Sequence, residues 1–443
     1  MQNQDNKCGY WGLAVVLFLA VLSPMSAWAA DLQVVCPSGA PGAFSSINAA
    51  LNALDSQGPN SIAVRGTCTE NIFLDRRERL NIFASPDQPA TIVAADPTAP
   101  VLQTFQSNGV DLGNLVFQGG SAGVIVNQGS DVTMFNCTMQ QNSGDGLGVQ
   151  IGATLVIEGG TLQNNGGNGM SVGASANVTI STAPGERTLV QNNSGDGIDV
   201  DASYFQVNFG NLTVQNNSGA ALAATGGRVV LFGGGGGENT FQNNGEGIDL
   251  FNAASATFFG KNTIRNNGDV GLQVLGSSVQ FNGNLAPDGT LNATVIEGHA
   301  TLGVNIVRLG EVAFNGPHKI HNNGNALADP TLMGGIRVVR GSLTLNQNAE
   351  LSGNFGPGIR AEQNSSLSFG SSTIVNNTQE GVRVTLQSEA AFPATPIFSG
   401  NGTASISCDT TSLISGSLAG VSNINCSRIV RTQGPPRPGR IVQ

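Results

Sequence analysis

A short phrase of small polar residues, glycine and two alternating apolar residues recurs eleven times between residues 123 and 384. A typical copy reads Gly146-Leu147-Gly148-Val149. Several steps between the glycines are 23 residues, as from Gly123 to Gly146 and from Gly335 to Gly358. A fixed period of this size is typical of a stacked solenoid in which each repeat is one supersecondary unit.

The residues of the phrase alternate with a period of two, which predicts a strand with one buried and one exposed face. The second strand of a repeat is expected at segments such as 132–135 and 343–345. Asparagine stands four residues before many of the glycines, where it suits a sharp turn and can form a stacked amide ladder. These positions are Asn142, Asn165, Asn193, Asn243, Asn267, Asn354 and Asn377.

With these residues the chain resembles the right-handed parallel β-helix proteins of the pectate-lyase-like superfamily. The resemblance covers most of residues 32–430 and implies an all-β, single-domain solenoid of about fourteen coils, which stack about 4.8 Å apart. An amphipathic helix over about residues 44–56 looks like the N-terminal cap of that superfamily.

The ends of the chain have their own features. Lys7, an apolar run over 13–22 and Ala-Trp-Ala at 27–29 predict a cleaved signal peptide over 1–29 and a secreted or periplasmic protein. Further divisions are expected at 30–120 (cap and first coils), 121–407 (regular repeats), 408–430 (C-terminal cap) and 431–443 (disordered tail). In an oxidising compartment, disulfides Cys36–Cys68 and Cys408–Cys426 would staple the two ends, leaving Cys137 as a buried, inert thiol.

Charge limits the classes of partner. Charged residues make up 11% of the chain and the formal net charge is −10, which argues against nucleic acid as a partner. The apolar run at 13–22 is too short to span a bilayer, so we expect no transmembrane segment in the mature chain, which we take to be monomeric.

The variable residue inside each phrase is predicted to form an outward ladder, and one part of this ladder is acidic. Asp196, Asp199 and Asp201 share one coil, and Glu246 and Asp249 occupy equivalent positions two coils later. The coil between them carries small residues, so Asp199 and Asp249 should lie about 9–10 Å apart. Paired carboxylates suit glycoside hydrolysis, and Asp196, Asp199 and Asp201 are also candidate Ca²⁺ ligands. Solubilising surface charge is the alternative.

A second part of the ladder is basic. Arg337, Arg360 and Arg383 stand on consecutive coils, with Arg340 and Arg308 nearby. A row of guanidinium groups suits carboxylates or sulfates of a polysaccharide. Local ion pairs with Glu362 and Glu380 are the alternative. His318 and His321 flank Lys319 without a third metal ligand in the sequence pattern.

Motifs of several enzyme families with this fold are missing from the sequence. The sequence lacks Asp-Pro-His-Asp, the set of Asn-Thr-Asp, Asp-Asp and Gly-His-Gly, and the pattern Arg-x-Pro-x-x-Arg. His299 follows a glycine, but no acidic pair accompanies it in the order that these enzymes have. We therefore expect a protein that binds extended polysaccharide along one β-face without catalysis. A lyase, hydrolase or epimerase acting on an acidic glycan, and an adhesin or structural rod, remain as alternatives.

Overall fold

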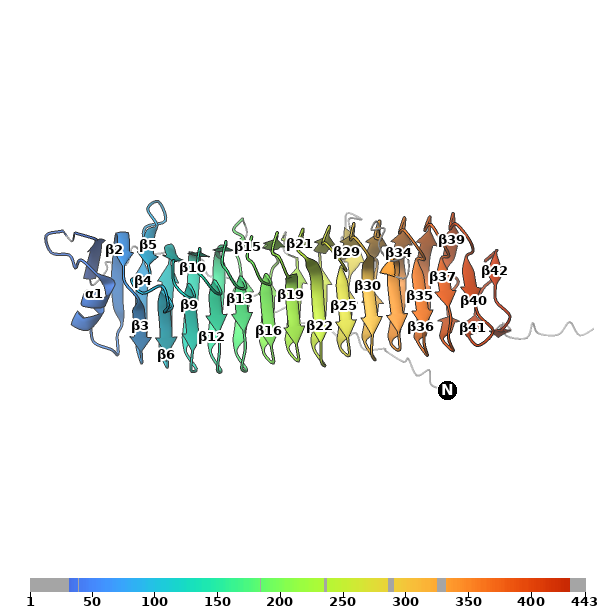
Figure 1. The fold of residues 1–443 in the computed structure, drawn as a ribbon, viewed down its shortest axis with the longest axis horizontal. Coiled ribbons are helices and arrows are strands. Elements are labelled where there is room, and N and C mark those ends of the chain that lie inside the picture. The colour runs from blue at the N-terminus through green and yellow to red at the C-terminus, as the bar shows by residue number, and fades with distance from the viewer. Residues whose placement is uncertain are drawn as a thin grey trace, which may run out of the picture.

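The computed structural model describes residues 32–38, 40–183, 185–234, 237–285, 291–324 and 332–430. The signal peptide expected at 1–29 and the tail expected at 431–443 lie outside these residues. The described chain winds into a rod whose coils follow one another from the N-terminal to the C-terminal end (Figure 1). The predicted parallel β-helix is confirmed.

One sheet holds the repeated phrase, and we call it the ladder sheet. Its fifteen strands pair in parallel with the strands of the preceding and following coils, which gives about fourteen turns. The strands are β3 (Ile72–Asp75), β6 (Leu102–Phe105), β9 (Val124–Asn127), β11 (Leu147–Val149), β13 (Met170–Val172), β16 (Ile198–Asp201), β19 (Ala220–Thr225), β22 (Glu246–Phe251), β25 (Leu272–Leu275), β30 (Leu302–Val307), β33 (Gly334–Val339), β35 (Ile359–Glu362), β37 (Val382–Val384), β40 (Ile406–Cys408) and β42 (Ile424–Asn425).

The second sheet has 26 strands because most coils contribute two successive strands to it, where the sequence predicted one. In β10, β12, β34 and β36 the two strands merge into a single strand of ten or eleven residues. The strands are β1 (Leu32–Cys36), β2 (Asn60–Thr69), β4 (Glu78–Phe83), β5 (Ala90–Val93), β7 (Asn108–Gly113), β8 (Leu115–Gln118), β10 (Asp131–Gln140), β12 (Thr154–Gln163), β14 (Asn177–Ser181), β15 (Thr188–Gln191), β17 (Tyr204–Asn208), β18 (Leu212–Gln215), β20 (Arg228–Gly233), β21 (Asn239–Gln242), β23 (Ser255–Gly260), β24 (Asn262–Arg265), β26 (Ser278–Asn282), β29 (Thr294–Glu297), β31 (Glu311–Asn315), β32 (Lys319–His321), β34 (Ser342–Ser352), β36 (Ser366–Val375), β38 (Glu389–Phe392), β39 (Ile397–Ser399), β41 (Leu413–Gly416) and β43 (Ile429–Val430). A small hairpin, β27 (Asn284–Leu285) and β28 (Leu291–Asn292), lies outside both sheets.

The core lies inside the coils, where equal positions stack on one another. Phe258, Phe281 and Phe314 stack with ring centroids 4.5 and 4.6 Å apart. Each inward residue therefore contacts its counterparts one coil above and below, which buries a continuous apolar column. Cys137 is a buried free thiol, as predicted, and burial raises its pKa to about 12.

The asparagines form the predicted ladder inside one turn, with one correction. Consecutive ladder asparagines are joined by a hydrogen bond from Nδ2 of one to Oδ1 of the next, as from Asn142 to Asn165 at 3.0 Å. At His299, the backbone amides of Asn267 and His299 make the two links instead. The member in the coil of Gly247 is Asn244 and not Asn243, because the turn before that glycine is one residue shorter. The ladder runs through Asn142, Asn165, Asn193, Asn217, Asn244, Asn267, His299, Asn323, Asn354, Asn377 and Asn401.

The N-terminal end carries the predicted helix, and each end carries a predicted disulfide. The cap helix α1 spans Ile47–Ala53, shorter than expected, and Ser46 caps it by accepting a hydrogen bond from the Ala49 amide. The Glu70 carboxylate accepts two more from the amides of Ile47 and Asn48. Disulfides join Cys36 to Cys68 and Cys408 to Cys426, as predicted.

Candidate functional site

The outward residues of the ladder sheet lie in the predicted register. Consecutive residues of this row are strand partners from the first rung to the last. The row reads Ile125, Gly148, Ser171, Asp199, Ala223, Asp249, Gln273, Asn305, Arg337, Arg360 and Arg383. Side chains from coils far apart in sequence therefore share one straight line on the rod.

Four carboxyl groups gather at the middle of this line, and we call them the acidic cluster. Asp199 and Asp249 are the strand neighbours of Ala223 on its two sides. Glu246 pairs with Ala220, and Asp196 lies on the other side of Ala220, whose amide donates to Asp196 Oδ1 at 2.7 Å. Alanine side chains thus separate two acidic coils, about 9–10 Å apart by strand spacing.

A second polar ladder leads into the acidic cluster. The Asn168 amide donates to Asp145 Oδ1 at 2.8 Å, and the Asp196 amide donates to Asn168 Oδ1 at 2.7 Å. Ser171 Oγ also donates to Asp145 Oδ2 at 2.7 Å. The sequence reasoning missed Asp145 and Asn168, although both directly precede a glycine of the repeated phrase, as Asp196 does.

Burial and mutual repulsion act on the protons of the acidic cluster. The side chain of Asp249 is 6% exposed, and its Oδ1 has no hydrogen-bond partner among the described residues. Burial, a hydrogen bond with Glu246 and the nearby charges of Glu246, Asp196 and Asp269 raise the pKa of Asp249 to about 9. This shift favours the neutral carboxylic acid form of Asp249 at pH 7.

The partners of Asp249 across the alanine coil remain more accessible. Burial, and then the charges of Asp196, Asp201 and Asp145, raise the pKa of Asp199. Burial also raises the pKa of Asp196, against the opposing hydrogen bond from the Ala220 amide. The cluster thus combines a protonated acid with carboxyl groups of different environment, an arrangement that acid–base chemistry uses.

The three calcium candidates do not form a compact cage. Within the described ranges, the one group of three possible metal ligands within 4.8 Å of one another is Cys36, Cys68 and Glu70, and both cysteines are in a disulfide. Asp201 is exposed at the end of β16, beside Thr225. Calcium binding by Asp196, Asp199 and Asp201 stays a prediction.

The basic part of the row is largely neutralised by its neighbours. Arg337 Nε lies 3.3 Å from Glu362 Oε2, and Arg383 lies 2.7 Å from Glu380 Oε2. Arg360 is 6% exposed, and burial lowers its pKa. Ligand binding by Arg337, Arg360 and Arg383 stays a prediction, in which these ion pairs would have to open.

Arg340 belongs to a different part of the surface. It lies in the turn after β33 with φ 52°, and Arg308 holds the same place after β30 with φ 54°. Both side chains are exposed.

The histidines are structural or surface residues. His299 replaces an asparagine in the amide ladder: its Nδ1 accepts from the Asn267 amide at 3.3 Å. His318 Nδ1 accepts from the Thr294 amide at 3.2 Å. Burial lowers the pKa of each to about 4. His321 pairs with Glu297 at 3.1 Å.

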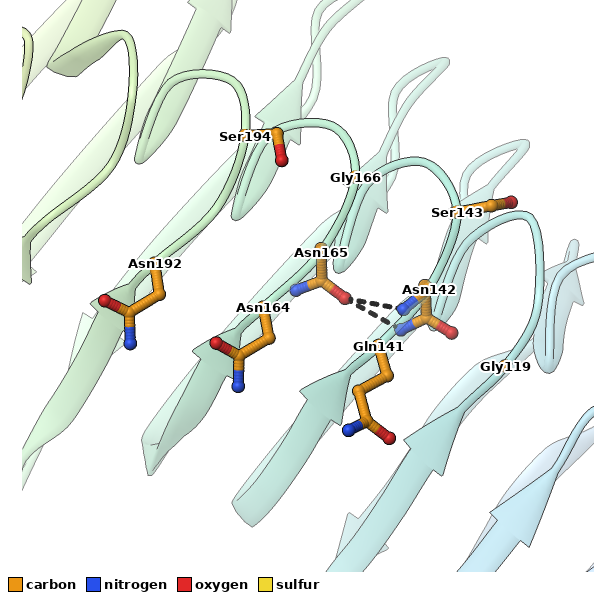
Figure 2. Close-up of a pocket in the computed structure, with 9 residues that line it drawn as sticks. All are labelled: Gly119, Gln141, Asn142, Ser143, Asn164, Asn165, Gly166, Asn192 and Ser194. Carbon is orange, nitrogen blue, oxygen red and sulfur yellow. Dashed lines mark hydrogen bonds between the residues drawn. The ribbon is translucent and has the colours of Figure 1, made fainter.

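A polar pocket of about 510 Å³ lies at the amide-ladder turn (Figure 2). Figure 2 shows Gln141, Asn164 and Asn192 at equal positions of consecutive coils, beside the buried Asn142 and Asn165. The three exposed residues have φ of 55–56°, a conformation that asparagine tolerates well. The residue types of Asn164 and Asn192 are therefore explained by the turn.

A sequence profile described as the right-handed beta helix region matches residues 101–235 and 237–417. The chain belongs to the right-handed β-helix family. This match covers more than half of the chain and confirms the handedness that the resemblance implied. No relative is found among curated proteins.

Solved structures of this fold include enzymes that act on polysaccharides. The A-module of Azotobacter vinelandii mannuronan C-5 epimerase AlgE6 is 12% identical with a TM-score of 0.38, covering 88% of this chain and 94% of that one. An alginate lyase from Paenibacillus sp. is 11% identical with a TM-score of 0.29, covering 90% and 99%. Pectate lyase Pel9A is 13% identical with a TM-score of 0.30, covering 90% and 80%. Likeness at this level concerns the fold alone.

Within the described residues, no helix of this β-helix protein is long and apolar enough to cross a membrane.

Proposed function

We propose that the protein binds an extended polysaccharide along the outward row of the ladder sheet, centred on the acidic cluster. The row is straight and in register over eleven coils, so it suits a long, extended ligand. Between Ser171 and Asn305 the row offers hydroxyl, carboxyl and amide groups, which bond to sugar hydroxyl groups.

The observation that carries the proposal is a pair of unsatisfied oxygens on this row. Asp249 Oδ1 and Asn305 Oδ1 are buried without a hydrogen-bond partner in the part of the chain that the structure describes. Gln273 lies between them, and Asn305 Nδ2 donates to Gln273 Oε1 at 2.8 Å. Buried acceptors are normally satisfied in proteins. A ligand hydroxyl that displaces the side chains covering these oxygens would supply the missing donors.

The test is calorimetric titration of the mature chain with acidic and neutral oligosaccharides. Ala223→Trp places a large side chain on the row at the centre of the acidic cluster and should abolish binding. Gln103→Trp is the matched control, because Gln103 holds the same position on β6, outside the cluster. No binding to any glycan, or equal loss in both variants, would refute the proposal.

An enzyme is the second candidate, and the protonated state of Asp249 favours it. A carboxylic acid with a raised pKa is a general acid, and a carboxylate across the gap acts as base or nucleophile. Asp249 would be the acid and Asp199 the base, with Asp196, Asp201 and Glu246 shaping their charge. Asp249→Asn and Asp199→Asn should each abolish turnover of a cleaved glycan while leaving its binding. Unchanged turnover would remove the assignment.

The proposal also includes a calcium site and a location outside the cytoplasm. Ca²⁺ held by Asp196, Asp199 and Asp201 would raise the Tm in a calcium titration, and Asp201→Asn would weaken that rise. We place the protein outside the cytoplasm, since its two disulfides suit an oxidising compartment.

A further inference from the structure

The ladder sheet carries an outward apolar stripe that the core does not need. Phe251, Leu275, Val307 and Val339 are strand partners on four consecutive coils, two residues beyond the outward row. Each is half-buried and faces away from the core. The residues at either end of the stripe are polar: Thr225 precedes Phe251, and Glu362 follows Val339. Contiguous apolar surface of this kind marks binding sites.

Two cations border one end of this stripe. Arg308 and Arg340 occupy successive turns, because the Arg308 amide donates to the Val339 carbonyl and the Arg340 amide to that of Glu362. Neither guanidinium has an ion-pair or hydrogen-bond partner among the described residues. Arg337 and Arg383, in contrast, are paired with Glu362 and Glu380. The Glu362 carboxylate thus contacts Arg337 and neither of the two turn arginines.

Apolar stripe and cations meet in one pocket of about 360 Å³. Its lining consists of Leu275, Val307, Arg308, Val339, Arg340 and Gln363. The pocket thus has an aliphatic floor, two positive groups and one amide. It lies on the C-terminal side of the acidic cluster, because its lining begins at Leu275 of β25, the strand that follows β22 in the ladder sheet.

We propose that this pocket binds a single acyl-chain anion of the fatty-acid class. The carboxylate lies between Arg308 and Arg340, which offer charge-assisted and bidentate hydrogen bonds. The hydrocarbon follows the stripe from Val339 and Val307 toward Leu275 and Phe251, over about 14 Å of coil spacing. Its burial on aliphatic side chains supplies the hydrophobic part of the affinity.

The aliphatic floor decides between ligand classes. A peptide would bring its N–H and C=O groups against the floor. The backbone groups of the strands beneath are already hydrogen-bonded to neighbouring coils, so the peptide groups would find no partners there. A sugar would likewise leave hydroxyl groups without partners there, at a free-energy cost. An acyl chain has no polar group along its length, so it alone leaves none unsatisfied.

The test is calorimetric titration of the full mature chain with laurate below its micelle concentration. We expect saturable one-to-one binding that Arg308→Gln/Arg340→Gln weakens about tenfold or more, the loss expected for charge-assisted hydrogen bonds. Val307→Asn should weaken it as well, through the floor. The charge-matched control, Arg65→Gln/Arg187→Gln, removes two exposed arginines elsewhere and should bind as the wild type does. Unchanged Tm values verify that each variant is folded.

Three results would overturn the proposal. They are equal affinity for dodecyltrimethylammonium, equal loss in the control variant, and binding to anionic phospholipid vesicles without binding of monomeric laurate. The experiment is independent of the glycan proposal, because Ala223→Trp should leave laurate binding unchanged and Arg308→Gln/Arg340→Gln should leave glycan binding unchanged.

Discussion

The Nδ2 atom of Asn165 lies 2.6 Å from the point that a Cβ atom on Gly146 would occupy. The glycine of the repeated phrase thus packs directly against the ladder asparagine of the next coil. Similar approaches recur at Gly169 with Asn193 (2.8 Å) and Gly358 with Asn377 (2.8 Å).

Gly146→Ala should therefore destabilise the rod by about 1–3 kcal/mol, the usual cost of overpacking. The extra methyl group meets both the Asn165 amide and the Gly169 carbonyl oxygen at 2.8 Å. Gly173→Ala is the control, because its Cβ would meet nothing within 4 Å. Urea unfolding measures both, and equal stability of the two variants would contradict the steric explanation.

Asn244 and Asn243 are neighbours with opposite expected sensitivity. Asn244 Oδ1 accepts from Asn217, and its Nδ2 donates to the Val214 carbonyl and to Asn267. Asn244→Ala leaves several buried groups unsatisfied and should cost about 2–4 kcal/mol or more, at about 1–3 kcal/mol for each such group. Asn243 is exposed with φ 56°, so Asn243→Gly should be nearly neutral. A larger decrease in Tm for Asn243→Gly than for Asn244→Ala would contradict the assignment of Asn244 to the ladder.

The protonated Asp249 should make the stability fall as the pH rises from about 4 to about 9. Its pKa rises from 3.8 to about 9 on folding. Between these values the folded protein binds a proton that the unfolded chain releases, so the free energy of unfolding falls as pH rises. Asp249→Asn should flatten this decline and raise the Tm at pH 8 relative to the wild type. An unchanged slope between pH 5 and pH 9 would show that Asp249 is already ionised.

Acid stability should depend on His299. Its pKa falls from 6.5 to about 4 on folding, so the unfolded chain gains a proton first and stability is lost as pH falls through this range. His299→Asn restores the common ladder residue and removes the titrating group. Its Tm should drop less between pH 7 and pH 4 than that of the wild type. His318, also buried with a pKa of about 4, accounts for acid sensitivity that remains.

The outward row could be predicted from the sequence because glycine, asparagine and alternation all depend on contacts between equal positions of adjacent coils. Once Gly197 and Gly247 are aligned, Asp199 and Asp249 follow in register. The error at Asn243 has a local cause. The turn there is one residue shorter than in other coils, and fixed counting from the glycine does not detect this.

The protonation and pairing of the candidate residues could not be predicted in the same way. The burial of Asp249 depends on how neighbouring coils cover it, and the pairing of Arg337 and Arg383 depends on side-chain conformations. The apolar stripe was missed for another reason. Val307 and Val339 look like core residues in a strand pattern, and only the register shows that they face outward.

The amide ladder also has a direction. Every rung donates toward the C-terminal end and accepts from the N-terminal side, so any two asparagine rungs present the same junction to each other. Excising residues 147–169 would bring Asn142 opposite Asn193 with the same donor and acceptor. Such a protein can gain or lose whole coils without needing a new kind of contact between them. Duplication or deletion of coils can therefore change the length of the rod independently of the residues on its surface.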